Sequence, residues 1–133
     1  MGTNDQIKAL RQLYNGFQAA RAIITANNLG IFEHLETPAS KSEAARKSGT
    51  DERATEILLD ALTGLGLLKK QHGMYKNAPL SSKFLIKGRP FYQGDIIRHS
   101  DFLWKRWSGL DETVRSGSPP AGGGRDLRAF ILG

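Results

Sequence analysis

Apolar residues in the first quarter of the chain recur with the period of an α-helix. Between about Asp5 and Asn27 they stand at steps of three and four: Ile7, Leu10, Leu13, Tyr14, Phe17, Ala20, Ile23 and Ile24. Asn28 and Gly30 supply the stop, and a shorter helix through residues 29–35 ends at Pro38. The apolar stripe is broad, which fits either a helix covered in part by a second subunit or a wide core-facing helix of a monomer.

The next segment predicts two helices joined by a tight turn. Ser40 and Glu43 have the spacing of a capping box, and the helix that they begin ends at Gly49. Thr50 is the expected N-cap of the following helix, which has acidic residues in its first turn. That helix is expected to turn one face to the core: Ala54, Ile57, Leu58, Ala61, Leu62 and Leu65.

A polar run at residues 69–77 follows, with Gly73 at its centre and apolar residues on both sides. This pattern is typical of a β-hairpin. A helix-turn-helix followed by a hairpin forms a winged helix, so the sequence predicts a mostly α-helical winged-helix fold with a small β-hairpin wing. A helix of one to two turns, capped by Ser81 or Ser82, is expected to run through Ile86.

The last third of the chain predicts one long helix and a flexible stretch. The helix is expected from Phe91 to about Arg115, and Gly109 favours a kink or break near its end. Residues 117–124 consist almost entirely of Gly, Pro and Ser, as in a loop or linker. A new apolar segment at 126–132 stops at Gly133, so we expect the chain to be the front part of a longer protein.

Charge is the first compositional feature that changes this picture. The 133 residues carry a formal net charge of +6, and the sequence pI is about 9.8, which raises nucleic acid as a partner. The excess lies after residue 68, whereas the second helix of the helix-turn-helix contains four carboxylates and only Arg53. Such a helix would be repelled by phosphates in a DNA groove. Nucleic acid is therefore a disfavoured partner, kept as an alternative by the overall charge.

The sequence offers no catalytic, cofactor-binding or metal-ligating residues. His34, His72 and His99 lack the spacing of metal ligands, and the glycine-containing stretches lack the phosphate-loop and dinucleotide patterns. There is no cysteine, which fits a reducing compartment. Without a signal pattern or an apolar run long enough for a membrane span, we expect a cytoplasmic protein with no membrane partner.

Aromatic residues suggest a different kind of site. Tyr14, Phe17 and Trp104 lie in segments that could line a pocket for a flat organic ligand, with Arg98 or His99 as a polar anchor. For Phe17 and Trp107 a place in the core is the simpler interpretation. Trp104 stands beside the main apolar stripe of its helix and is the better candidate.

These pieces, in this order, resemble the N-terminal dimerisation domain of the two-domain S-adenosylmethionine-dependent O-methyltransferases. Five segments carry the resemblance: Tyr14-Asn-Gly-Phe17, Asn28-Leu-Gly-Ile-Phe-Glu-His-Leu35, residues 57–68, Tyr75-Lys-Asn-Ala-Pro-Leu80 and residues 107–117. The resemblance implies dimerisation helices at 1–37 and a winged helix at 38–89. It also implies that 90–133 holds the long helix, the Gly/Pro-rich loop and the start of a linker to an absent catalytic domain.

The resemblance also implies a role for the chain. It would act as a homodimeric, substrate-covering module of an enzyme that methylates a small aromatic hydroxyl compound. Tyr14 and Phe17 would reach the substrate across the dimer, and the helix carrying His99 and Trp104 would form part of the pocket roof. S-adenosylmethionine and the general base would belong to the absent domain, so this chain alone would bind no cofactor and be inactive. The alternatives are a winged-helix DNA-binding transcription regulator and a protein-interaction domain.

Overall fold

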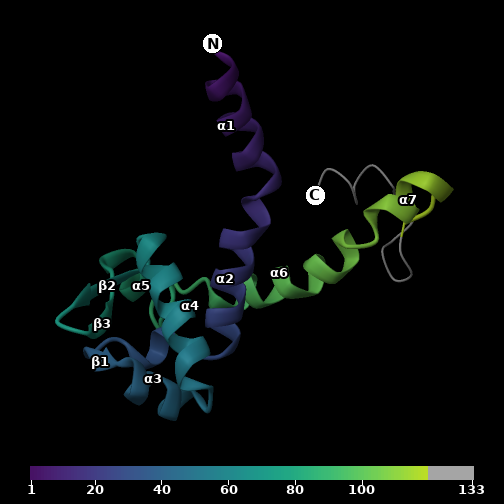
Figure 1. Cartoon of the computed structure of the whole chain (residues 1–133). Coiled ribbons are helices and arrows are strands. Elements are labelled where there is room, and N and C mark those ends of the chain that lie inside the picture. The colour runs from purple at the N-terminus through teal and green to yellow at the C-terminus, as the bar shows by residue number, and fades with distance from the viewer. Residues whose placement is uncertain (120–133) are drawn as a thin grey trace. The chain divides into compact units, whose positions relative to one another are not determined.

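The computed structural model describes residues 1–119 and is mostly helical, with a small antiparallel sheet (Figure 1). Its elements are α1 (Thr3–Tyr14), α2 (Gly16–Asn28), the single 3-10 turn η1 (Phe32–His34), β1 (Ala39–Ser40), α3 (Lys41–Ser48), α4 (Glu52–Gly64), β2 (Leu68–Gln71), β3 (Met74–Asn77), α5 (Pro79–Phe84), α6 (Gly94–Trp107) and α7 (Leu110–Ser116). The chain forms two compact units, residues 1–97 and the part that begins at Arg98.

The first predicted helix is divided in two at Asn15. This residue has φ −91° and ψ 0°, and its backbone N–H still donates to the Arg11 carbonyl at 2.9 Å. Asn and the following Gly16 are both poor helix formers, which explains the interruption that apolar periodicity alone did not reveal. The expected helix at 29–35 is reduced to the turn η1.

The caps around the turn between α3 and α4 agree in part with the prediction. The Ser40 hydroxyl accepts from the Glu43 backbone N–H at 3.2 Å, and Gly49 ends α3 in the left-handed region with φ 67°. The expected Thr50 cap is wrong. The N-cap of α4 is Asp51, whose carboxylate accepts from the Ala54 N–H at 2.8 Å.

The predicted hairpin is present, and a third strand extends it. β2 and β3 pair in register from Leu68 opposite Asn77 to Gln71 opposite Met74. The two loop residues, His72 and Gly73, both have positive φ, the conformation of a tight hairpin turn that follows the strand twist. β1 pairs with β3 on the other side, giving the strand order β1-β3-β2. A two-residue strand has no pattern of its own that sequence analysis could detect.

The core of the N-terminal unit lies between α2, η1, α3, α4 and the sheet. It comprises Ala26, Ile31, Phe32, Leu35, Ala39, Ala44, Leu59, Leu62, Leu67, Leu68, Tyr75, Leu85 and Ile86. The buried side of α4 is formed by Thr55, Leu59 and Leu62, whereas Ile57 and Leu65 of the predicted core face are exposed. Apolar residues occupy more than one side of α4, so the packing partners decide which side is buried.

The helices after the sheet differ from the prediction at their starts. Pro79 begins α5 as its first residue, and Ser81 lies inside the helix, where its buried hydroxyl donates to the Leu67 carbonyl at 2.7 Å. The predicted long helix begins at Gly94 rather than Phe91. Its break near Gly109 is confirmed, since α6 ends at Trp107 and α7 begins at Leu110. Residues 126–132 lie outside the described part of the chain.

Candidate functional site

Large apolar side chains of α1, α2 and α4 in the N-terminal unit remain in contact with solvent. Leu13 of α1 is 80% exposed, Phe17 of α2 54% and Ile57 of α4 61%. No residue of α1 is buried, although a helix of this length is marginal in water without packing. We call the exposed residues Leu10, Leu13, Tyr14, Phe17, Ile57 and Leu65 the open face. A patch of this kind marks an interaction surface.

A groove of about 280 Å³ lies between α2 and α4, and it shares Leu65 with the open face. Its lining is Asn15, Gln18, Ala19, Ala22, Ala61 and Leu65. The alanines leave room for the close approach of another element, and the amides at one end offer hydrogen bonds. The groove therefore has a size and a mostly apolar lining that suit the binding of a partner's side chains.

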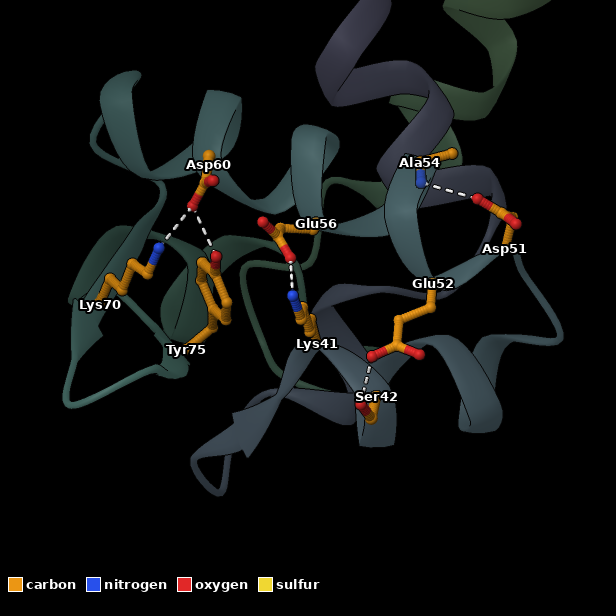
Figure 2. Close-up of polar contacts among 9 residues, drawn as sticks. All are labelled: Lys41, Ser42, Asp51, Glu52, Ala54, Glu56, Asp60, Lys70 and Tyr75. Atoms are coloured by element: carbon orange, nitrogen blue, oxygen red, sulfur yellow. Dashed lines mark hydrogen bonds and ion pairs between the residues drawn. The ribbon is translucent and has the colours of Figure 1, made fainter.

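The carboxylates of α4 fasten this helix to its own unit (Figure 2). Glu52 accepts from the Ser42 hydroxyl at 2.5 Å, and Glu56 forms an ion pair with Lys41. Both partners belong to α3, so two turns of α4 are tied to the first turn of α3. The hydrogen bond to Glu56 raises the pKa of Lys41.

Asp60 makes the corresponding connection to the hairpin (Figure 2). Its Oδ1 accepts from the Tyr75 hydroxyl at 2.5 Å and from Lys70 Nζ at 3.0 Å. The hydrogen bond from Tyr75, followed by that from Lys70, holds the pKa of Asp60 below its ordinary value. Burial is the main cause that raises the pKa of Tyr75. The helix that would read DNA in a winged-helix regulator thus carries carboxylates that bind neighbouring elements of its own unit.

The four candidate substrate contacts are divided between the two units. Tyr14 and Phe17 flank the interruption at Asn15, and both belong to the open face. His99 and Trp104 lie on α6 after residue 97. His99 stacks on Phe102, with ring centroids 6.0 Å apart, and Trp104 is half-buried.

The interpretation of Phe17 and Trp107 as core residues is wrong for the described chain. Phe17 is 54% exposed and Trp107 is 40% exposed. Their helices expose apolar residues on more than the side that packs, so periodicity did not separate an interior stripe from an interaction stripe.

A polar cluster around Glu36 is a feature that sequence reasoning missed. Glu36 accepts from the Ser82 hydroxyl at 2.6 Å and from Asn77 Nδ2 at 2.9 Å, and it pairs with Arg89 at 2.5 Å. The Ser82 bond is the main cause that lowers the pKa of Glu36. These residues are far apart in the sequence, and no local pattern connects them.

The described residues lack two further features, a metal-binding cluster and a membrane-spanning helix. Between residues 1 and 119, no three His, Asp or Glu side chains are grouped so that they could hold a metal ion. No helix within the same span has both the length and the apolar character needed to cross a bilayer.

Comparison with known proteins identifies the family. The family model described as the O-methyltransferase dimerisation domain matches residues 11–87. Acetylserotonin O-methyltransferase of Mus musculus is 34% identical over 118 residues, which cover 83% of this chain and 30% of the relative. A 3-hydroxy-5-methyl-1-naphthoate 3-O-methyltransferase of Streptomyces sahachiroi is 32% identical over 112 residues, covering 83% of this chain and 32% of the relative.

A solved structure supports the same assignment. Human N-acetylserotonin methyltransferase in complex with SAM superposes with a TM-score of 0.78 at 28% identity, covering 89% of this chain and 37% of that one. The chain thus spans about a third of the length of the relatives that it matches. Since the family model covers more than half of the chain, including α2, α3, α4 and the hairpin, the chain belongs to the O-methyltransferase dimerisation domain family.

Proposed function

We propose that the chain is the dimerisation and substrate-covering domain of an S-adenosylmethionine-dependent O-methyltransferase that acts on a small aromatic hydroxyl compound. The observation that carries the proposal is the family match over residues 11–87, which includes most of the residues of the open face. Two relatives are named for aromatic hydroxyl acceptors, N-acetylserotonin and a hydroxynaphthoate. We place the protein in the cytoplasm, which its lack of cysteine fits.

We further propose that residues 38–89 form a winged helix that serves packing rather than DNA binding. The order α3, α4, β2 and β3 is that of a helix-turn-helix followed by a wing. The acidic residues of α4 support the packing role, because they bind Lys41 and Lys70. A duplex would have to displace these contacts and would meet carboxylates in return.

The open face is proposed to bind a second copy of the chain. α1 needs a surface that covers its apolar side, and the groove between α2 and α4 has a floor of small residues. In a two-fold dimer each copy offers both features, so the groove of each copy can receive the apolar side of α1 from the other. Tyr14 and Phe17 are then placed beside the partner, where they contact its acceptor.

The cofactor is assigned to the part of the protein that this chain does not span. Nucleotide-type cofactors bind at the carboxyl ends of parallel strands followed by helices, whereas the described sheet is antiparallel with the order β1-β3-β2. These residues therefore do not fit S-adenosylmethionine. When bound elsewhere in the enzyme, the cofactor supplies the methyl group, and we derive no transfer step from this chain.

The role proposed for the described residues is to bind and orient the acceptor. Tyr14 and Phe17 of the N-terminal unit, and Trp104 of the second unit, each offer an aromatic side chain of the kind that packs against a flat ring in offset or edge-to-face geometry. His99 adds a polar group that can bond to a substituent of the ring. Holding the acceptor in a reactive orientation accounts for much of the rate in such transfers.

The proposal is tested with the full-length protein, by measuring transfer of labelled methyl groups from S-adenosylmethionine to a panel of phenols. We expect turnover with bicyclic phenols and a rise of about tenfold in the acceptor KM for Tyr14→Ala and Phe17→Ala. The KM for S-adenosylmethionine should not change. Leu80→Ala is a matched control because Leu80 and Phe17 are both 54% exposed.

Two results would contradict the proposal. One is an absence of methyl transfer to any hydroxyl compound of the panel. The other is micromolar binding of random duplex DNA at about 150 mM salt with a steep salt dependence, which would favour a DNA-binding regulator.

A further inference from the structure

The first helix of the chain, α1, is not covered by the unit to which it belongs. Every residue from 1 to 18 is exposed, and the main neighbour of α1 is α2, which follows it directly in the chain. Burial begins only within α2, where Ile24 is 5% exposed and Ala26 fully buried. The backbone hydrogen bonds of α1 therefore gain little support from the packing of the N-terminal unit.

The ends of α1 add little stability to this helix. It has 12 residues, and its N-cap is Gly2, which makes no side-chain cap hydrogen bond. At the other end stand Asn15 and Gly16, both poor helix formers. Helices shorter than about 12 to 15 residues are marginal in water on their own. A stable α1 thus needs a contact from outside its own unit.

One side of α1 offers such a contact. Ile7, Leu10, Tyr14 and Phe17 follow one another at steps of three and four, the spacing by which two helices pack along a shared line. We call these four residues the seam. Ile7 is 45% exposed and Leu10 57% exposed, so burial of the seam is a stabilising contribution that the single chain does not yet make.

We propose that α1 becomes a stable helix only when its seam lies on a second copy of the chain, so that dimerisation and the folding of α1 occur together. This inference rests on the dimer proposed above through the open face. The match to the dimerisation domain begins at residue 11, within α1, and continues to residue 87. The seam is therefore continuous with the segment by which the family is described, which favours a second copy as its partner.

Coupled folding makes the helix propensity of α1 a determinant of dimer affinity, even at positions that touch nothing. If α1 forms on association, a residue that disfavours the helix weakens the dimer, and it does so twice because each copy contributes one α1. If α1 were already formed in the single chain, the same residue would destabilise monomer and dimer alike. Substitution on the solvent side of α1 separates these two cases.

The test compares Lys8→Gly with Lys8→Ala in the full-length protein by sedimentation. Lys8 is exposed and lies on the opposite side of α1 from Leu10, since two residues turn a helix by about 200°. In a helix interior Gly is disfavoured relative to Ala by roughly two- to fivefold. With two copies of α1 in the dimer, we expect the dimer Kd of Lys8→Gly to exceed that of Lys8→Ala by roughly five- to twentyfivefold.

Lys47 provides the matched control. It is an exposed lysine of α3, a helix that buries Ala44 and Ala45 in its own unit and is therefore formed before association. Lys47→Gly and Lys47→Ala should differ in urea unfolding, while their dimer Kd values stay within about twofold of one another.

Hydrogen exchange of the full-length protein measures the folding of α1 directly. Ile57→Asp changes the open face on α4 and leaves the sequence of α1 intact. In the monomeric Ile57→Asp protein we expect exchange in peptides covering residues 3–14 to be at least about tenfold faster than in the wild-type dimer. Peptides covering β2 and β3 should exchange at unchanged rates, which shows that the unit itself remains folded.

Two results would overturn the proposal while leaving the dimer in place. One is an equal dimer Kd for Lys8→Gly and Lys8→Ala, and the other is full protection of residues 3–14 in monomeric Ile57→Asp. A monomeric wild type would refute the open-face dimer together with this inference. An absence of methyl transfer would refute the enzymatic function alone, because neither measurement on α1 depends on activity.

Discussion

Replacing Tyr75 by Phe removes one hydroxyl from the contact between α4 and the hairpin. Tyr75 is 2% exposed, and its hydroxyl donates to Asp60 Oδ1 at 2.5 Å. A hydrogen bond to a charged acceptor contributes about 1.5 to 3 kcal/mol. The Asp60 side chain is 47% exposed and keeps Lys70, so water can replace the lost donor. We therefore expect a loss of only about 1 kcal/mol in the free energy of unfolding at pH 7.

The loss of stability caused by Tyr75→Phe should become smaller as the pH falls. The pKa of Asp60 is lowered in the folded protein, mainly by the Tyr75 hydrogen bond, from an ordinary value of 3.8. A lowered pKa stabilises the fold fully at pH values above 3.8, and this contribution is lost as the pH falls through the folded value. The difference between wild type and variant should thus shrink as the solution is acidified to about pH 3.

Urea unfolding at one fixed protein concentration measures this difference. With an m-value of about 2 kcal/mol per molar, the midpoint should fall by about 0.5 M at pH 7. Tyr14→Phe is the control, since Tyr14 is 57% exposed, and its midpoint should not move. In the Asp60→Asn background the effect of Tyr75→Phe should become smaller, because the two residues share the bond. An equal loss at pH 7 and pH 3, or no loss at pH 7, would refute the argument.

Three further changes test other parts of the molecule. Ile57→Asp, on the open face, should weaken self-association of the full-length protein by more than about tenfold in sedimentation. Lys76→Asp, on the exposed hairpin, should leave self-association unchanged. If Ile57→Asp associates as strongly as the wild type, the proposed interface is contradicted. Glu36→Gln should destabilise the fold by about 1 kcal/mol. Because the pKa of Glu36 is lowered from 4.5, the difference in thermal unfolding should begin to shrink below that pH and disappear as the pH falls through the lowered pKa of the folded state. Gly73→Ala should cost about 1 kcal/mol because residue 73 has φ 74°, while Gly64→Ala, at a helical position with open space, should be neutral or stabilising by chemical denaturation.

Signals carried by neighbouring residues predicted much of the local structure. The Ser40 cap, the Gly49 stop, the hairpin turn at Gly73 and the break near Gly109 each depend on a few adjacent residues. Such features follow from backbone conformation and local hydrogen bonds, which act in the same way in any fold.

Local signals failed where two of them competed at one place. At the start of α4, Thr50 and Asp51 are both good N-cap residues, and the structure uses Asp51 while the Thr50 hydroxyl lies 2.6 Å from that of Thr55. In the first predicted helix, the apolar periodicity continues across Asn15 although the helix is interrupted there. Periodicity shows which residues share a side of a helix and does not show whether the helix is continuous.

The sequence by itself determined that this chain is mostly helical, that a hairpin follows two capped helices, and that its segments resemble a dimerisation domain. Only the tertiary structure decided which side of α4 is buried, because apolar residues lie on more than one side of it. It also decided that the carboxylates of α4 bind Lys41 and Lys70, and that the side-chain amide of Asn27 donates a hydrogen bond to the Gly94 carbonyl. These contacts join residues that are distant along the chain, and their formation depends on how whole elements pack rather than on any local preference.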